Sequence, residues 1–131
     1  MEAHVTEWLS LDVMLPAPGQ GALAVQCRAD DVATLSLLSV LEDAPTRTAV
    51  TAERQFLLSL GGGCAVPVAA YAAVSGQPPA ISLAGLVASV NGKKLIKVTD
   101  DGADPFALGK SLAQEAIVRG ADEILKLVTE N

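Results

Sequence analysis

The sequence has few of the side chains on which metal, redox and membrane functions depend. It contains two cysteines and one histidine in 131 residues, and Cys27 and Cys64 do not have the spacing of zinc ligands. We therefore predict no metal site. No apolar run approaches the roughly 20 residues of a membrane-spanning helix, and polar residues interrupt the N-terminal stretch where a signal peptide would be apolar. These absences favour a soluble, cytoplasmic protein with reduced cysteines and no membrane contact.

Aromatic residues and positive charge are also scarce. Only 3% of the residues are aromatic although half are apolar, so the core must consist mainly of Ala, Val, Leu and Ile. The net charge is −6, and an acidic chain is repelled by the phosphates of nucleic acids. We therefore predict no nucleic-acid partner. The one basic cluster, at Lys93, Lys94 and Lys97, is interpreted as a solvated hairpin or strand.

A glycine-rich stretch near the N-terminus does not have the context of a nucleotide site. Residues 19–24 fit the pattern G-x-G-x-x-A, but a dinucleotide site needs a strand before these glycines and a helix after them. Here Pro16 and Pro18 come before, and the apolar stretch Ala22–Cys27, which reads as a strand, comes after. We interpret the prolines and glycines as a flexible crossover. The full phosphate-loop pattern G-x-x-x-x-G-K-[S/T] does not occur, because Asp104 stands where Gly109-Lys110-Ser111 would need the first glycine.

Apolar periodicity predicts an α+β fold for the rest of the chain. The order is α-β-β-β-α, in which helices cover one face of a three-stranded antiparallel sheet, preceded by a crossover segment, a strand and a helix. Asn91-Gly92 is typical of the turn in a hairpin, and Asp104-Pro105 is typical of a helix start. The expected helices are Asp31 to about Leu41, about Thr46–Leu60, Asp104–Arg119 and Ala121–Val128.

Glu53 falls within the apolar stripe of the second predicted helix. Ala49, Ala52, Phe56 and Leu60 share that face at helical spacing. A carboxylate directed at a core is costly unless it is hydrogen-bonded or paired. We interpret Glu53 as an acceptor for backbone amides of a neighbouring turn, either Gly61–Gly63 or Gly19–Gly21, with a catalytic acid as the alternative.

Three consecutive glycines precede Cys64, between this helix and the first strand of the sheet. Glycines are tolerated where the backbone bends sharply or approaches another molecule. Cys64 is therefore either presented to a ligand at the tip of a loop or buried as an inert small hydrophobe. Spacing alone leaves both readings open.

The longer strings of the sequence resemble one known family. These strings are Leu15–Val25, Cys27–Asp31, Ala52–Arg54 and Gly62–Val68, together with Leu108-Gly109 and Gly120-Ala121. In order and spacing they are similar to the C-terminal portion of the porphobilinogen deaminase (hydroxymethylbilane synthase) family, over essentially the whole chain from Met14. Gln26, where the family commonly has glutamate, is a minor departure.

The resemblance implies a role for Cys64 and its loop. In the family, the matching thiol forms a thioether to a dipyrromethane cofactor, onto which four porphobilinogen molecules are polymerised with release of ammonia. Gly62 and Gly63 would leave room for the growing pyrrole chain, and Glu53 would support their turn. The catalytic aspartate of the family matches no residue here, so we expect no catalytic residue in this fragment and no activity from it alone.

The resemblance also implies two parts. Residues 1–44 would be a crossover segment with a strand and a helix that pack on missing N-terminal domains, and residues 45–131 would be the cofactor-attachment domain. The intact enzyme is expected to be a monomer, whereas the fragment, with Ala22–Cys27 as an unpaired edge, is expected to self-associate. The alternative function is a stand-alone interaction module in which Cys64 is structural.

Overall fold

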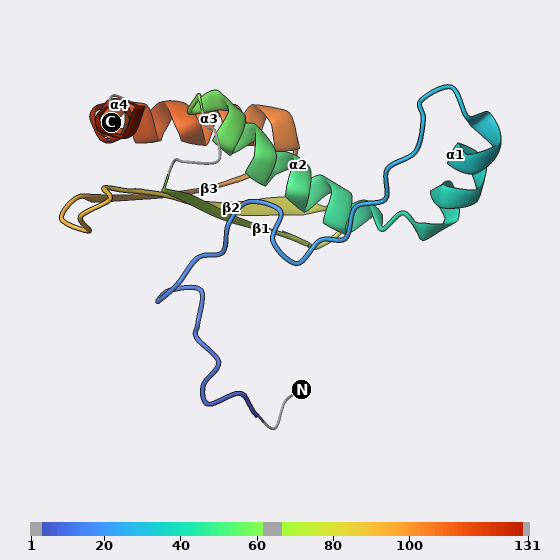
Figure 1. The fold of residues 1–131 in the computed structure, drawn as a ribbon, viewed down its shortest axis with the longest axis horizontal. Helices are drawn as coiled ribbons and strands as arrows, with labels where there is room; N and C mark the ends of the chain where they lie inside the picture. The colour runs from blue at the N-terminus through green and yellow to red at the C-terminus, as the bar shows by residue number, and fades with distance from the viewer. Residues whose placement is uncertain (1–3, 62–66, 130–131) are drawn as a thin grey trace.

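The computed structural model describes residues 4–61 and 67–129, and its centre is a three-stranded sheet. The strands β1 (Val68–Ser75), β2 (Ala80–Ala88) and β3 (Leu95–Gly102) are antiparallel and lie in the order β1-β2-β3. Helices α2 (Ala44–Ser59) and α3 (Pro105–Val118) lie on one face of the sheet (Figure 1). The predicted α+β class and the α-β-β-β-α order are confirmed.

Strand β2 is the central strand, and one of its faces is directed at the helices. Val68 pairs with Val87 and Ile81 pairs with Gly102, so β2 is hydrogen-bonded along both edges. Because side chains alternate across a strand, Ile81, Leu83 and Val87 all point into the core, where they are buried. This is the alternation that the sequence predicted.

Small residues allow the helices to approach the sheet and each other closely. A methyl group built on Gly85 of β2 would lie 2.4 Å from the ring of Phe56, which is completely buried. On α3, a methyl group at Gly109 would lie 2.5 Å from the carbonyl oxygen of Ala52. With so few aromatic residues, the core is filled by one phenylalanine ring in a glycine notch and by closely packed helix backbones.

The helix starts follow their sequence signals. The Asp43 carboxylate accepts a 2.9 Å hydrogen bond from the backbone amide of Thr46 and caps α2. Hydrogen bonds from the Thr46 side chain and backbone hold the pKa of Asp43 below its ordinary value, because they favour the charged form. Asp104 caps α3 in the same way at the amide of Ala107, as predicted.

The last helix, α4 (Ala121–Thr129), begins directly after Gly120. Gly120 has a φ of +99°, a left-handed conformation that glycine adopts without steric cost, and it ends α3 as the sequence predicted. Ile124 of α4 is buried against the core. Within the described residues, no helix has the length and apolar content needed to cross a bilayer.

The chain before α2 differs from the predictions in two respects. Ala22–Cys27 forms no strand, since no other described strand lies beside it to share hydrogen bonds. Helix α1 (Val32–Leu38) continues as the short 3-10 helix η2 (Ser39–Leu41). The three-residue spacing of its apolar side chains predicts one buried face, but Val32, Leu35 and Leu41 are all exposed.

A similar difference occurs on α3. The apolar spacing predicts that Phe106 shares the buried face of Leu108 and Leu112, but Phe106 is exposed.

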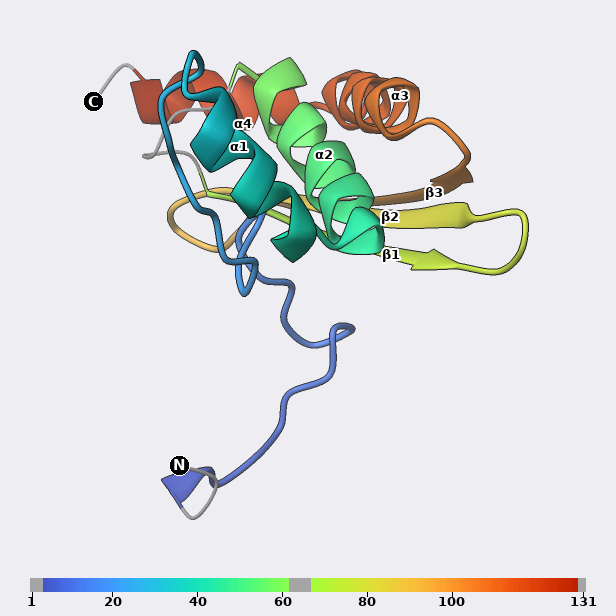
Figure 2. The same ribbon diagram turned by 90° about the vertical axis from the view of Figure 1, so that its right-hand side faces the viewer.

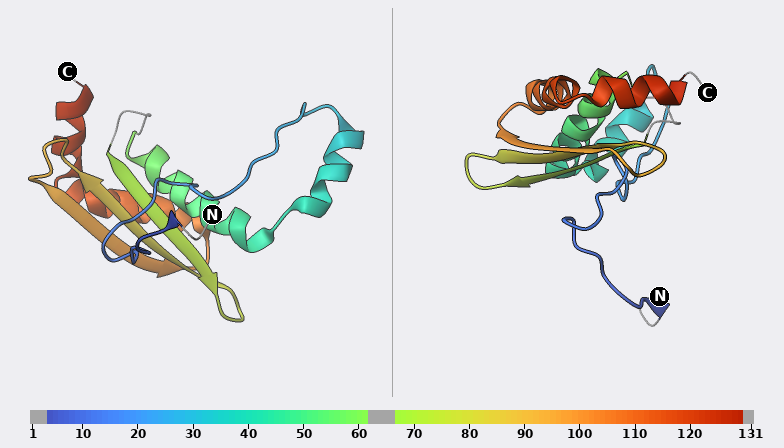
Figure 3. Two further views of the ribbon diagram at one scale, coloured as in Figure 1. Left: turned by 60° about the horizontal axis from the view of Figure 1, so that its bottom comes forward. Right: turned by 90° about the vertical axis from the view of Figure 1, so that its left-hand side faces the viewer.

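The exposures before α2 follow from where that part of the chain lies. Helix α1 belongs to residues 22–43, here named the arm, which extend away from the sheet (Figure 1). The N-terminal segment leaves the sheet on the side opposite to the helices (Figures 2 and 3). The side chain of Leu23 is 100% exposed and that of Trp8 is 80% exposed. No other described helix or strand covers the exposed apolar side chains of the arm or of the N-terminal segment.

Candidate functional site

Glu53 joins three segments that are far apart in the sequence. It is 6% exposed and projects from α2 toward the edge strand β1. Its Oε1 accepts a 2.8 Å hydrogen bond from the amide of Ala72 in β1. Its Oε2 accepts a 2.6 Å hydrogen bond from the amide of Gly19. Both carboxylate oxygens therefore have charge-assisted partners, which is how a buried carboxylate is tolerated.

The crossover is also bound directly to the sheet. The carbonyl of Pro16 accepts a 3.1 Å hydrogen bond from the amide of Ala70, which lies two residues before Ala72 in β1. Gly19 has a φ of +76°, and a methyl group built on it would lie 3.8 Å from Val50 of α2. The amides of Ala70 and Ala72 would otherwise be open on an edge strand. The Pro16–Gly21 segment thus covers the edge of β1 and is not the free crossover that the sequence indicated.

Of the two turns proposed as partners of Glu53, the Gly19–Gly21 turn is contacted through the amide of Gly19, whereas Gly62 and Gly63 of the other turn lie outside the described residues. The bond to Ala72 was not anticipated from the sequence. A signal for it existed, because the first strand of a three-stranded meander is an edge strand whose outward amides need acceptors from elsewhere. Whether Glu53 also supports the loop before Cys64 stays a prediction.

Cys64, Gly62 and Gly63 lie outside the described residues. What the structure gives is the two ends of their loop. Leu60 is buried at the end of α2, and β1 begins at Val68. Gly61 has a φ of +74°, and a methyl group built there would meet no atom of the described residues within 4 Å.

The chemistry of the side chain is what fits an attached group here. A thiol is the nucleophile that a thioether requires. The attachment of a pyrrole cofactor to Cys64 stays a prediction.

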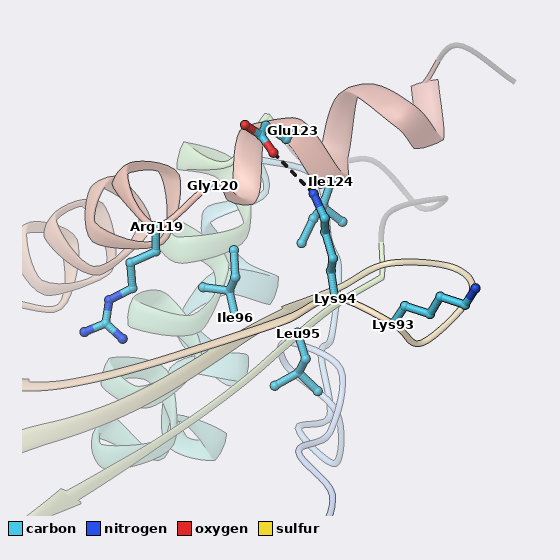
Figure 4. A pocket seen from close by; sticks show the side chains of 8 residues that line it. All are labelled: Lys93, Lys94, Leu95, Ile96, Arg119, Gly120, Glu123 and Ile124. Carbon is cyan, nitrogen blue, oxygen red and sulfur yellow. Dashed lines mark hydrogen bonds and ion pairs between the residues drawn. The ribbon is translucent and has the colours of Figure 1, made fainter.

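Lys93 and Lys94 of the basic cluster border a hollow of about 350 Å³ between the β2–β3 hairpin and the α3–α4 turn, whereas Lys97 lines a different hollow. Lys94 is paired with Glu123 at 3.4 Å, while the side chains of Lys93 and Arg119 point in opposite directions (Figure 4). Arg119 donates instead to the carbonyl of Lys97 at 3.2 Å. The cations do not converge on a common ligand position, which agrees with the interpretation of a solvated hairpin.

A second hollow, of about 460 Å³, lies on the uncovered face of the sheet beside the N-terminal segment. Leu11 and Leu15 form one wall, and Tyr71 and Thr99 belong to the other. Asp12 and Lys97 approach to 3.9 Å across it. Among the described residues, no three His, Cys, Asp or Glu side chains are grouped so that they could hold a metal ion.

Two family models match the chain. Residues 47–117 match the model described as "Porphobilinogen deaminase, C-terminal domain". Residues 1–36 match the model described as "Porphobilinogen deaminase, dipyromethane cofactor binding domain". Cys64 lies within the first range, so the description of the second model does not itself assign the residue to which the cofactor is attached.

Curated relatives match over nearly the whole chain. Porphobilinogen deaminase of Brevibacillus brevis is 49% identical over 131 residues, which are 99% of this chain and 42% of the relative. The Syntrophotalea carbinolica enzyme is 50% identical over 124 residues, 93% of this chain and 39% of the relative. The Staphylococcus aureus enzyme is 43% identical over 126 residues, with 96% and 41% covered.

The chain thus spans about two fifths of the length of the curated relatives that it matches. A family model covers more than half of it, from α2 into α3, and all the strings that carry the resemblance except Gly120-Ala121 lie within the matched ranges. The chain belongs to the porphobilinogen deaminase family.

Proposed function

We propose that this chain is the C-terminal part of a hydroxymethylbilane synthase and carries its dipyrromethane cofactor on Cys64. The observation that carries the proposal is the match of residues 47–117 to the C-terminal domain of the family, with Cys64 and its glycines inside that range. Gly62 and Gly63 would leave room beside the thiol for a growing chain of pyrroles.

A thiol suits this attachment chemically. The Cys64 sulfur would form a bond to the methylene carbon of a pyrrole while the carbon–nitrogen bond of its aminomethyl group breaks. The thiol proton would leave with the nitrogen as ammonia, so the exchange needs no oxidant or reductant. Sulfur is a soft nucleophile at an electron-poor carbon. When bound, the cofactor supplies the primer onto which four porphobilinogen molecules are added.

The chain's own residues would hold this anchor in place. Helix α2 and strand β1 fix the two ends of the loop, and Glu53 ties both elements to the crossover. The resemblance matches the family's catalytic aspartate to no residue of this chain, so under this proposal catalysis would need further segments of the enzyme. Asp30, Asp31 and Glu53 are not substitutes, because Asp30 pairs with Arg28 and the other two bind backbone amides.

The two-part organisation belongs to the same proposal. Residues 1–44 would pack on N-terminal domains of the enzyme, which would cover the apolar side chains of the arm. Residues 45–131 would form the cofactor-attachment domain. The intact enzyme would act as a cytoplasmic monomer on porphobilinogen, and this chain alone would be inactive.

Mass spectrometry of the peptide that contains Cys64 tests the assignment. In active enzyme that includes this sequence, that peptide should carry the mass of a dipyrromethane, and the peptide containing Cys27 should be unmodified. Cys64→Ser should remove both the adduct and the activity, while Cys27→Ser should retain both. An unmodified Cys64 in active enzyme would refute the attachment.

A further inference from the structure

The two edges of the sheet differ in how their backbone groups are bound. Strand β1 has its outward amides occupied, at Ala70 by the carbonyl of Pro16 and at Ala72 by the carboxylate of Glu53. Strand β3 is the other edge, because the strands lie in the order β1-β2-β3 (Figure 3). An edge strand presents a row of amides and carbonyls with which a further strand can pair. A partner strand is therefore to be sought along β3.

Alternation along the strands identifies the groups that β3 turns outward. In β1 the even-numbered residues face outward, as the amide of Ala70 does, so its odd-numbered residues are bonded to even-numbered residues of β2. The odd-numbered residues of β2 then face β3, where they are paired with even-numbered residues. The amides and carbonyls of Lys97, Thr99 and Asp101 therefore point outward. The hydrogen bond from Arg119 to the carbonyl of Lys97 agrees with this direction.

These outward groups are largely open. Within residues 4–61 and 67–129, the outward amide and carbonyl of Thr99 have no hydrogen-bond partner. The amide of Asp101 donates only to the carboxylate of Asp100, its neighbour in sequence, at 2.9 Å. The carbonyl of Lys97 accepts from Arg119 at 3.2 Å, and a carbonyl oxygen can accept a second bond. Strand β3 can therefore pair with a further strand without losing a bond to β2.

We propose that β3 pairs with β3 of a second copy of this chain, antiparallel and with the two Thr99 residues opposite each other on a two-fold axis. Lys97 of each copy then stands opposite Asp101 of the other copy. These side chains are exposed on the face of the sheet that the helices do not cover. Cross-strand pairs of opposite charge and of threonine with threonine stabilise adjacent strands. The contact is self-complementary, as two-fold symmetry requires.

Charge selects this register over its neighbours. An axis through Lys97 would place two ammonium groups opposite each other, and an axis through Asp101 would do the same to two carboxylates. An axis through Val98 or Asp100 would leave each charge opposite an uncharged side chain. Only an axis through Thr99 brings both charges of each strand opposite a charge of the other sign.

Helix α3 leaves room for the second copy. It lies over β3, because a methyl group built on Gly102 would lie 3.4 Å from Leu108. Gly109 marks the side of α3 that faces α2. At about 100° per residue, Ser111 and Val118 lie on the opposite side, and Val118 is 78% exposed. These short side chains allow α3 of the second copy to lie alongside, where it would cover Val118.

The pairing competes only with weak contacts and is itself weak. Asp12 approaches the ammonium group of Lys97 to 3.9 Å and its own side chain is 97% exposed, so it is easily displaced. A contact between two short strands lies at the small end of protein interfaces, and the net charge of −6 opposes the approach of two copies. Dimers should therefore form only at high protein concentration, in agreement with a monomeric intact enzyme.

Sedimentation equilibrium of the 131-residue chain at concentrations up to about 1 mM tests the pairing. Leu37→Ser is present in every sample, so that association through the arm is reduced. Thr99→Pro removes an outward amide and no bond to β2, and it should weaken the dimer at least tenfold, because two hydrogen bonds are lost. Thr99→Val keeps the amide and is the matched control, with a change of less than about threefold. A chain that stays monomeric at 1 mM, or a dimer that tolerates Thr99→Pro, would overturn the proposal.

An exchange of charges tests the register. Lys97→Asp and Asp101→Lys each place like charges opposite one another, so each variant alone should dimerise at least tenfold more weakly. An equimolar mixture of the two should restore the dimer to within about threefold, because every introduced side chain then faces an opposite charge. Asp101→Lys also makes the net charge less negative, so general repulsion alone would predict stronger association of this variant. A mixture that associates no better than the single variants would refute the register.

Discussion

The body (residues 44–129) and the chain before it are made from the same kinds of apolar residue but use them differently. In the body, Phe56, Ile81 and Leu112 are buried between helices and sheet. In the arm and the N-terminal segment, Leu23, Val40 and Met14 remain exposed. The two regions differ in whether a second layer of secondary structure is present, because an apolar face is buried only where another element covers it. Composition alone therefore does not say which residues form a core.

The largest expected effect is at Phe56. Phe56→Ala should empty the notch at Gly85 and lower the free energy of unfolding by about 3–5 kcal/mol, measured by urea denaturation. Leu37→Ala on α1 is the control and should change it by less than about 0.5 kcal/mol. Similar losses at the two positions would show that the arm is part of the folded core.

Glu53→Ala should come next, because it removes the contact between the two regions. It leaves the amides of Gly19 and Ala72 without their acceptor, and hydrogen bonds to charged groups contribute about 1.5–3 kcal/mol each. We expect a loss of about 3 kcal/mol in the free energy of unfolding. Glu115→Ala should cost much less, since its partner Arg119 is exposed. Equal costs at the two glutamates would contradict the role given to Glu53.

Gly109→Ala should have a smaller but clear effect within the body. The added methyl group would lie 2.5 Å from the carbonyl oxygen of Ala52, so α2 and α3 would have to separate. Overpacking of this kind costs about 1–3 kcal/mol, and a lower urea midpoint should report it. Gly92→Ala is the control in open space, although its positive φ adds a small strain of its own.

The pH dependence of stability should include a contribution from the cap of α2. The pKa of Asp43 is below its ordinary value of 3.8, so the unfolded chain binds the proton more tightly. The contribution is fully present above about pH 4 and is lost as the pH falls through the pKa of the folded state. Asp43→Asn should flatten this part of the curve of urea midpoint against pH. An identical curve for the variant would exclude the contribution.

A substitution in the arm should reduce self-association of the chain and leave the stability of the body unchanged. Leu37→Ser removes an exposed apolar side chain from α1. It should shift sedimentation profiles toward the monomer, with a urea midpoint equal to that of the unchanged chain. Oligomers that persist undiminished would place the self-association elsewhere.

The sequence predicted the body well because its signals were local and agreed with one another. Alternation in β2, the Asp104 cap and the stop at Gly120 each specified an element on their own. The arm was predicted less well, since Ala22–Cys27 has the composition of a strand and becomes one only beside another strand. Glu53 was recognised by its place in an apolar stripe. Its second partner, Ala72, depends on tertiary arrangement, which residue spacing does not encode.

The position of Trp8 has a practical consequence. It is the only tryptophan and is 80% exposed. It belongs to the N-terminal segment, which lies on the side of the sheet away from the helices (Figure 2). Its emission should therefore be that of a hydrated indole in both the native and the denatured chain. Fluorescence would hardly register melting of the body, which circular dichroism would follow. A blue shift would instead report whatever molecule comes to cover that segment, which makes Trp8 a built-in probe for binding at this part of the chain.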